Sequence, residues 1–106
     1  MRLLFICSRN RRRSPTAERL FAERAGVETD SAGLSPDADV PLEPEQIRWA
    51  DLIFVMEPVH RARLNRRFGG VLRGSRVIVL GIPDRFGFMD PELVTLLEQR
   101  CSAWLP

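Results

Sequence analysis

Two short, uninterrupted apolar runs constrain the fold of this chain more than any other feature of its sequence. LLFI lies within residues 2–6, and LIFVM lies within residues 51–56. Strands with one solvent-exposed face alternate apolar and polar residues. Continuous apolar runs of this length are instead typical of parallel strands buried on both faces. Because parallel strands need long crossover connections, usually helical, the two runs predict an α/β fold.

The segments outside these runs carry helix signals and weaker strand signals. Ser14 predicts an N-cap, Pro15 fits the first helical position, and Gly26 predicts the end of that helix. Three more helices are predicted. One covers residues 45–50, one begins at Pro58 and stops before Gly69–Gly70, and the last begins at Asp90–Pro91. Residues 27–31 and 76–80 complete a set of four predicted strands.

Strands that alternate with helices predict the architecture. We expect residues 1–106 to form a single three-layer α/β domain, with a four-stranded parallel sheet and helices on both faces. Ligands of such sheets bind beyond the carboxyl ends of the strands. Residues 7–13, after the first strand, and the loop at 82–88, after the last, are both predicted to lie there.

Composition narrows the class of protein. A chain of 106 residues with 44% apolar and 28% charged residues is typical of a globular domain. It has no apolar run long enough to span a bilayer, and its apolar N-terminus is too short for a signal peptide, so we expect a cytoplasmic protein without a membrane partner. Cys7 and Cys101 have neither metal-ligand nor disulfide spacing, which predicts two free thiols, Cys101 in the core, and no metal or other cofactor.

Positive charge is concentrated near the start of the chain. The net charge is only +2, yet the first 26 residues carry seven arginines and two glutamates. Proteins that bind long polyanions usually have a basic excess over the whole domain. A local excess at one turn instead favours a compact anion.

The stretch CSRNRRRS at residues 7–14 has the composition of a phosphate pocket. A loop between a strand and a helix can direct its backbone N–H groups inward, beside the positive end of the helix dipole. Such surroundings stabilise a thiolate, so Cys7 is a candidate nucleophile, and the planar fork of Arg13 suits two phosphoryl oxygens. Ser14 can donate its hydroxyl to the thiolate, and Asn10 tolerates the positive φ that a tight loop requires. The predicted phosphate-binding set is Ser8, Arg9, Asn10, Arg11, Arg12, Arg13 and Ser14.

At this point the sequence resembles the low-molecular-weight protein tyrosine phosphatases. Their signature is a cysteine, five residues, an arginine, a serine and then Pro-x-Ala-Glu, and this chain has CSRNRRRSPTAE at residues 7–18. The resemblance continues through SAG at 31–33, ADLI at 50–53 with VM at 55–56, and LG at 80–81. It therefore spans most of the chain.

The resemblance implies a cysteine-dependent phosphomonoesterase, most simply a protein tyrosine phosphatase, that works without a metal. Cys7 would form a phosphocysteine, Arg13 would hold the phosphoryl oxygens, and an aspartic acid would protonate the leaving oxygen. Two residues compete for the role of the acid. Asp90 has the Asp-Pro context of the family, but that context also starts helices, so we favour Asp84. Phe86 or Phe88 would supply the aromatic wall beside the acid.

Three departures from the family pattern bear on substrate choice. Arg9 replaces the usual glycine, and Arg12 stands where many members have a second cysteine that protects the first. The segment between SAG and ADLI, residues 34–49, is also shorter than usual and lacks the aromatic residue that lines the phosphotyrosine cleft. The phosphate pocket is therefore expected to be intact, while the tyrosine slot is expected to be open or lost.

Two other functions compete with the phosphatase. One is a phosphate-binding module without turnover, and the other, which we favour least, is nucleic-acid binding through RNRRR and the RARLNRR stretch at 61–67. The arginines of the latter stretch, and His60, are predicted to lie on a helix surface, with His60 at most half-buried. Expected partners are a phosphorylated protein or a small phosphomonoester as substrate, and inorganic phosphate or sulfate in the loop.

Overall fold

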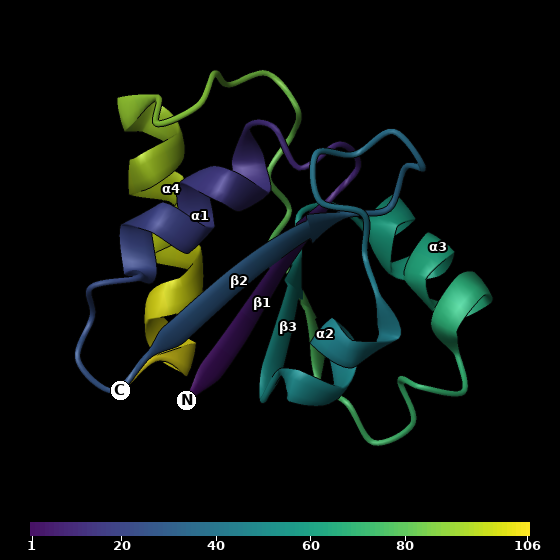
Figure 1. Cartoon of the computed structure of the whole chain (residues 1–106). Helices are drawn as coiled ribbons and strands as arrows, with labels where there is room; N and C mark the ends of the chain where they lie inside the picture. The colour runs from purple at the N-terminus through teal and green to yellow at the C-terminus, as the bar shows by residue number, and fades with distance from the viewer.

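The computed structural model describes all 106 residues, and strands alternate with helices along the chain (Figure 1). The strands are β1 (Arg2–Cys7), β2 (Glu28–Gly33), β3 (Leu52–Val55) and β4 (Val77–Val79). The helices are α1 (Arg13–Phe21), α2 (Pro44–Trp49), α3 (Pro58–Phe68) and α4 (Pro91–Cys101), and a short 3-10 helix covers Ser102–Trp104. The predicted α/β fold with four strands is confirmed.

The four strands form one parallel sheet in the order β2-β1-β3-β4. The chain adds β2 on one side of β1 and then crosses to add β3 on the other side. The carboxyl end of β1 therefore lies at the switch point of the sheet, where parallel sheets bind their ligands. The register pairs Cys7 with Gly33, which places the SAG sequence beside the candidate nucleophile.

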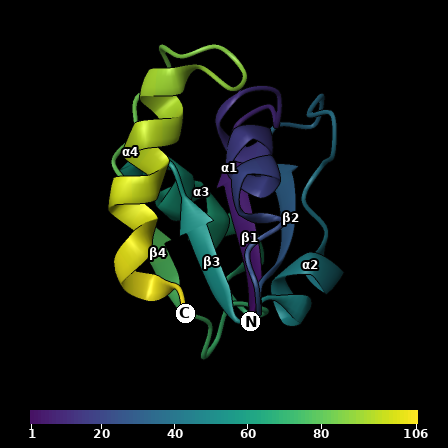
Figure 2. The same cartoon turned by 90° about the vertical axis from the view of Figure 1, so that its left-hand side faces the viewer.

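Helices cover both faces of the sheet, and each face has its own apolar core. Alternate strand residues such as Phe5 and Phe54 pack against α1 and α4, while their neighbours Leu4 and Ile53 pack against α2 and α3. Figure 2 shows α1 and α4 in front of the strands and α3 behind them. Burial on both faces explains why these strands are uninterrupted apolar runs.

The boundaries of the first helix differ from the prediction. It begins at Arg13, with Arg12 at the N-cap position, so the prediction of Ser14 as N-cap is wrong. The reason is that the Ser14 hydroxyl is buried against the Cys7 thiol and is not free to cap the helix. The helix also ends at Phe21, and Gly26 instead makes the turn into β2 with a φ of +78°. None of the helices has the length and apolarity to cross a membrane.

Candidate active site

One cavity of about 360 Å³ opens at the carboxyl edge of the sheet. Its lining residues are Cys7, Ser8, Arg9, Arg11, Arg12, Arg13 and Asp84. The loops after β1, β2 and β4 all reach this edge, at the top of Figure 1, and both chain termini lie at the opposite edge. The cavity thus brings together the two loops that the sequence placed at this edge.

Cys7 is held at the floor of the cavity by two polar neighbours. The backbone N–H of Asn10 donates to Cys7 Sγ at 3.3 Å, and Ser14 Oγ lies 2.9 Å from the same sulfur. When the sulfur is a thiolate it accepts from both groups, and the first turn of α1 adds the positive end of its dipole. Hydrogen-bonding groups therefore lie against the sulfur of the candidate nucleophile.

A buried hydrogen-bond network lies behind the loop. Asn10 adopts a φ of +57°, as predicted, and its side-chain amide donates to Ser14 Oγ and Ser31 Oγ, each at 2.9 Å. Ser31 Oγ in turn donates to Glu18 Oε1 at 2.5 Å. The network explains why the glutamate of SPTAE and the serine of SAG accompany the loop, because both hold Asn10 in a conformation that few side chains tolerate.

The glycine of SAG is required by close packing. A Cβ on Gly33 would lie 2.5 Å from the Ala38 side chain and 2.6 Å from the Ser8 carbonyl oxygen. The loop after β2 also bonds to the loop after β1, because Ser35 N–H donates to the Ser8 carbonyl at 2.8 Å. The two loops therefore support each other.

The backbone of the first loop supplies free donors. The N–H groups of Ser8, Arg9, Arg11 and Arg12 donate to no other group of the protein, although all four residues line the cavity. A set of such donors around one small cavity is suited to an anion.

Arg13 is fixed in place by residues that follow two other strands, β3 and β4. Its side chain is 4% exposed, and Nη1 donates to Glu57 Oε1 at 2.6 Å and to the Ile82 carbonyl at 2.7 Å. Glu57 follows β3 and was not singled out from the sequence. Glu57 holds one edge of the guanidinium, so the remaining N–H donors of Arg13 can bind an anion in the cavity.

The two candidate acids occupy different places. Asp84 lines the cavity, with its Oδ1 3.8 Å from Arg13 Nε and its side chain 61% exposed. Asp90 does not line the cavity, and its Oδ1 accepts the Glu92 N–H at 2.9 Å as the N-cap of α4. The cap interpretation of the Asp-Pro sequence is confirmed, and the geometry brings only Asp84 to the cavity.

His60 is buried, so its prediction as a surface or half-buried residue is wrong. Its Nδ1 accepts the Glu57 N–H at 3.0 Å, which leaves the proton on Nε2, 3.0 Å from Ser8 Oγ. Burial, and then the nearby positive charge of Arg13, lower the pKa of His60 from 6.5 to about 4. A neutral imidazole thus links α3 to the phosphate loop.

The depressed pKa of His60 predicts loss of stability in acid. Between pH 6.5 and 4 the unfolded chain binds a proton that the folded chain does not, so stability falls as pH falls. Over this window the free energy of unfolding of the wild type should drop by up to about 3 kcal/mol more than that of His60→Gln. Urea unfolding at several pH values measures this, and equal pH slopes for the two proteins would contradict it.

The predicted aromatic wall and the predicted solvated arginines both differ in the structure. Phe86 packs in the core and no aromatic residue lines the cavity, so the prediction of an aromatic wall from Phe86 is wrong. Phe88 is exposed. On α3, Arg63 reaches Ser8 Oγ at 3.5 Å and Arg67 bonds to the Leu34 carbonyl, so these two arginines are not purely solvated.

The second cysteine lies in the core as predicted. Cys101 is fully buried on α4, among the apolar residues that pack against β1 and β3. Burial raises the pKa of its thiol to about 12, which leaves it protonated and unreactive at neutral pH. Cys7 is therefore the thiol available for chemistry.

Comparison with solved structures gives the same fold over nearly the whole chain. YwlE arginine phosphatase from Geobacillus stearothermophilus is 25% identical with a TM-score of 0.75, over 96% of this chain and 90% of that one. A C7S mutant of YwlE with a phosphorylated active-site serine is 27% identical with a TM-score of 0.75, over 97% and 95%. The tyrosine phosphatase Wzb from Escherichia coli K30, in complex with phosphate, is 26% identical with a TM-score of 0.75, over 97% and 94%.

A scan against family models and a search of curated proteins found no match. The fold and the cavity around Cys7 nevertheless define a cysteine-dependent phosphatase. Over nearly its whole length the chain is similar to solved arginine and tyrosine phosphatases of the low-molecular-weight protein tyrosine phosphatase type. The solved relatives share its compact length, since the chain covers at least 90% of each of the three.

Proposed function

We propose that this protein hydrolyses phosphorylated side chains of proteins through a phosphocysteine intermediate. Phosphotyrosine is the substrate class that we favour. The observation that carries the proposal is the grouping of Cys7 Sγ, free backbone N–H groups and the Arg13 guanidinium around one cavity. A phosphoryl group has three equatorial oxygens that accept from such donors. We place the reaction in the cytoplasm.

The first step transfers the phosphoryl group to the protein. The Cys7 thiolate attacks phosphorus, so that an S–P bond forms while the bond from phosphorus to the leaving oxygen breaks. Asp84, as the carboxylic acid, donates its proton to that oxygen. The free N–H groups of Ser8, Arg9, Arg11 and Arg12 and the fork of Arg13 hold the phosphoryl oxygens throughout.

The second step returns the protein to its starting state. The Asp84 carboxylate accepts a proton from water, and the water oxygen attacks phosphorus as the S–P bond breaks. Inorganic phosphate leaves and the thiolate is regenerated, with Ser14 Oγ 2.9 Å from the sulfur to donate to it. The same aspartate therefore acts as acid and then as base.

The solved structures of the relatives support this chemistry. The phosphorylated serine in the YwlE C7S mutant indicates transfer to that position, and phosphate and sulphate complexes of Wzb support an inorganic anion in the loop of this chain. Because one relative is an arginine phosphatase and the other a tyrosine phosphatase, assays of this protein should include phosphoarginine as well as phosphotyrosine peptides.

The choice of Asp84 as the acid predicts a large loss of catalytic rate when Asp84 is replaced, and none when Asp90 is. Asp84→Asn should lower kcat on an aryl phosphate by roughly 10²- to 10⁴-fold, because an amide cannot protonate the leaving oxygen. Asp90→Asn, which keeps a capping side chain on α4, is the matched control and should change kcat less than about twofold. Steady-state hydrolysis with EDTA present measures both.

The opposite pattern, with the loss in Asp90→Asn, would overturn the assignment of the acid. Phosphate binding without any turnover in the wild type would instead favour a binding module. Salt-sensitive affinity for nucleic acid that does not depend on Cys7 would favour the remaining alternative.

A further inference from the structure

The four arginines that line the cavity divide into two pairs by their contacts. Arg13 meets Glu57 at 2.6 Å and Asp84 at 3.8 Å, and Arg11 Nε meets Asp39 Oδ1 at 3.1 Å. Arg9 and Arg12 also line the cavity, but neither side chain has a hydrogen bond or a carboxylate within 4.0 Å. Two guanidinium groups at the cavity therefore have no partner in the protein.

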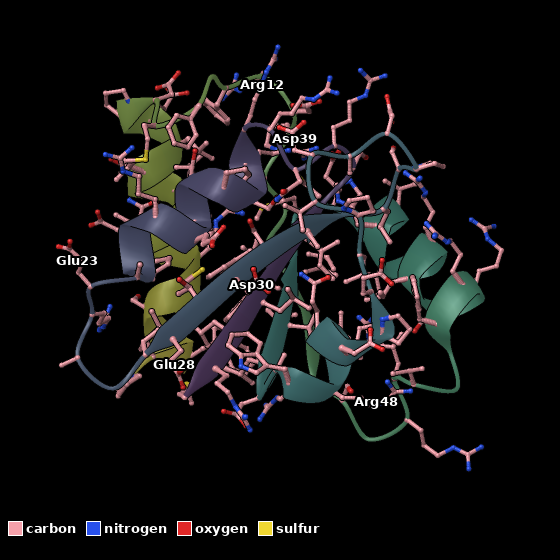
Figure 3. All side chains as sticks on the ribbon, viewed as in Figure 1. Arg12, Glu23, Glu28, Asp30, Asp39 and Arg48 are labelled. Atoms are coloured by element: carbon pink, nitrogen blue, oxygen red, sulfur yellow. The ribbon has the colours of Figure 1, made fainter.

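The backbones that carry these two side chains are held in place. The Arg9 carbonyl accepts the Asp39 N–H at 3.1 Å, and the Arg12 carbonyl accepts the N–H and the hydroxyl of Thr16 at 3.1 and 2.6 Å. Both side chains are exposed, and Figure 3 shows Arg12 projecting from the edge of the molecule. Arg9 and Arg12 thus present free charge at a fixed rim rather than inside the phosphate loop.

The lining of the cavity is charged and polar rather than apolar. Cys7 is the only apolar residue in the lining, and Phe86 is buried in the core. Discrimination among phosphorylated substrates must therefore come largely from groups outside the phosphoryl binding loop. A guanidinium fork on an exposed rim is suited to carboxylates.

We infer that Arg9 and Arg12 bind acidic residues that flank the phosphorylated residue of a protein substrate. The inference rests on the proposed function and specifies its substrate class. The rim position favours flanking residues, because the phosphorylated side chain itself occupies the cavity between the rim and Cys7. Each exposed charge pair contributes modestly, so the two together should give about a tenfold preference, equivalent to about 1.4 kcal/mol.

Matched phosphotyrosine peptides test the inference, with glutamates or glutamines on both sides of the phosphotyrosine. For the wild type at low salt, kcat/KM should be about tenfold higher for the glutamate peptide, and high salt should reduce this ratio. In the double variant Arg9→Gln with Arg12→Gln the ratio should fall close to one. Arg73→Gln, an exposed arginine remote from the cavity in the turn after α3, should keep the wild-type ratio.

Taking a ratio within one preparation cancels any difference in folded or active fraction between variants. Equal rates on the two wild-type peptides, or an unchanged ratio in the double variant, would overturn the inference. Hydrolysis of both peptides that depends on Cys7 would leave the proposed function standing in that case. If neither peptide is hydrolysed while an aryl phosphate is, the inference also fails and cysteine-dependent phosphatase chemistry remains. Hydrolysis that persists in Cys7→Ser would instead refute the proposed function.

Discussion

Replacing Cys7 with serine is expected to lower aryl phosphate hydrolysis by roughly 10⁴-fold or more. The sulfur accepts from Asn10 N–H at 3.3 Å and lies 2.9 Å from Ser14 Oγ, at the cavity where the substrate would bind. A serine hydroxyl at the same place stays protonated at neutral pH and is a much weaker nucleophile than a thiolate. The loss should appear in kcat, because the phosphate-binding donors remain.

Cys101→Ala is the control for this substitution. Its thiol is buried in the core with a pKa raised to about 12, so its removal should affect stability and leave kcat within about twofold. A binding measurement with inorganic phosphate completes the comparison, because Cys7→Ser should still bind the anion. Retention of full activity by Cys7→Ser would rule out the covalent mechanism.

The second large effect is expected at Arg13, where Arg13→Lys should lower kcat/KM by roughly 10²- to 10³-fold. Arg13 Nη1 already donates to Glu57 and to the Ile82 carbonyl. The other nitrogens of the planar guanidinium remain as donors for the phosphoryl oxygens. A lysine ammonium keeps the charge but cannot serve both sides in the same geometry. The part-buried Glu57 carboxylate should therefore compete with the substrate for the lysine ammonium in the variant.

Arg19→Lys on the exposed face of the same helix is the matched control and should change kcat/KM less than twofold. Because both substitutions conserve charge, the comparison isolates the shape of the guanidinium. Equal activity of Arg13→Lys and the wild type would mean that Arg13 supplies only charge at the cavity.

Local sequence patterns were enough to predict the sheet and the loop that faces the cavity. The strands around Phe5 and Phe54 are buried on both faces, so their composition alone indicated a parallel sheet. The distinction between Asp84 and Asp90 also followed from local rules, because Asp-Pro-Glu is a helix start and the structure uses it as one. These features depend on residues close together in the chain.

Glu57 and His60 could not be recognised in the same way. Glu57 acts on Arg13 across 44 positions of the chain, and His60 meets Ser8 across 52. Burial of a histidine depends on the packing of α3 against the sheet, which no local pattern specifies. The one available signal was the spacing of Glu57, Pro58 and His60, since a polar residue three positions after an N-cap can bond back to it, as His60 does.

Capture of the covalent intermediate tests the central claim most directly. The protein is mixed with an excess of aryl phosphate, quenched in acid within a turnover, and analysed by mass spectrometry of its peptides. The two-step mechanism predicts one added phosphoryl group, on the peptide that contains Cys7 and on the sulfur itself. A protein that turns over substrate at the same rate with no phosphorylated Cys7, or with the phosphoryl group on another residue, would contradict it.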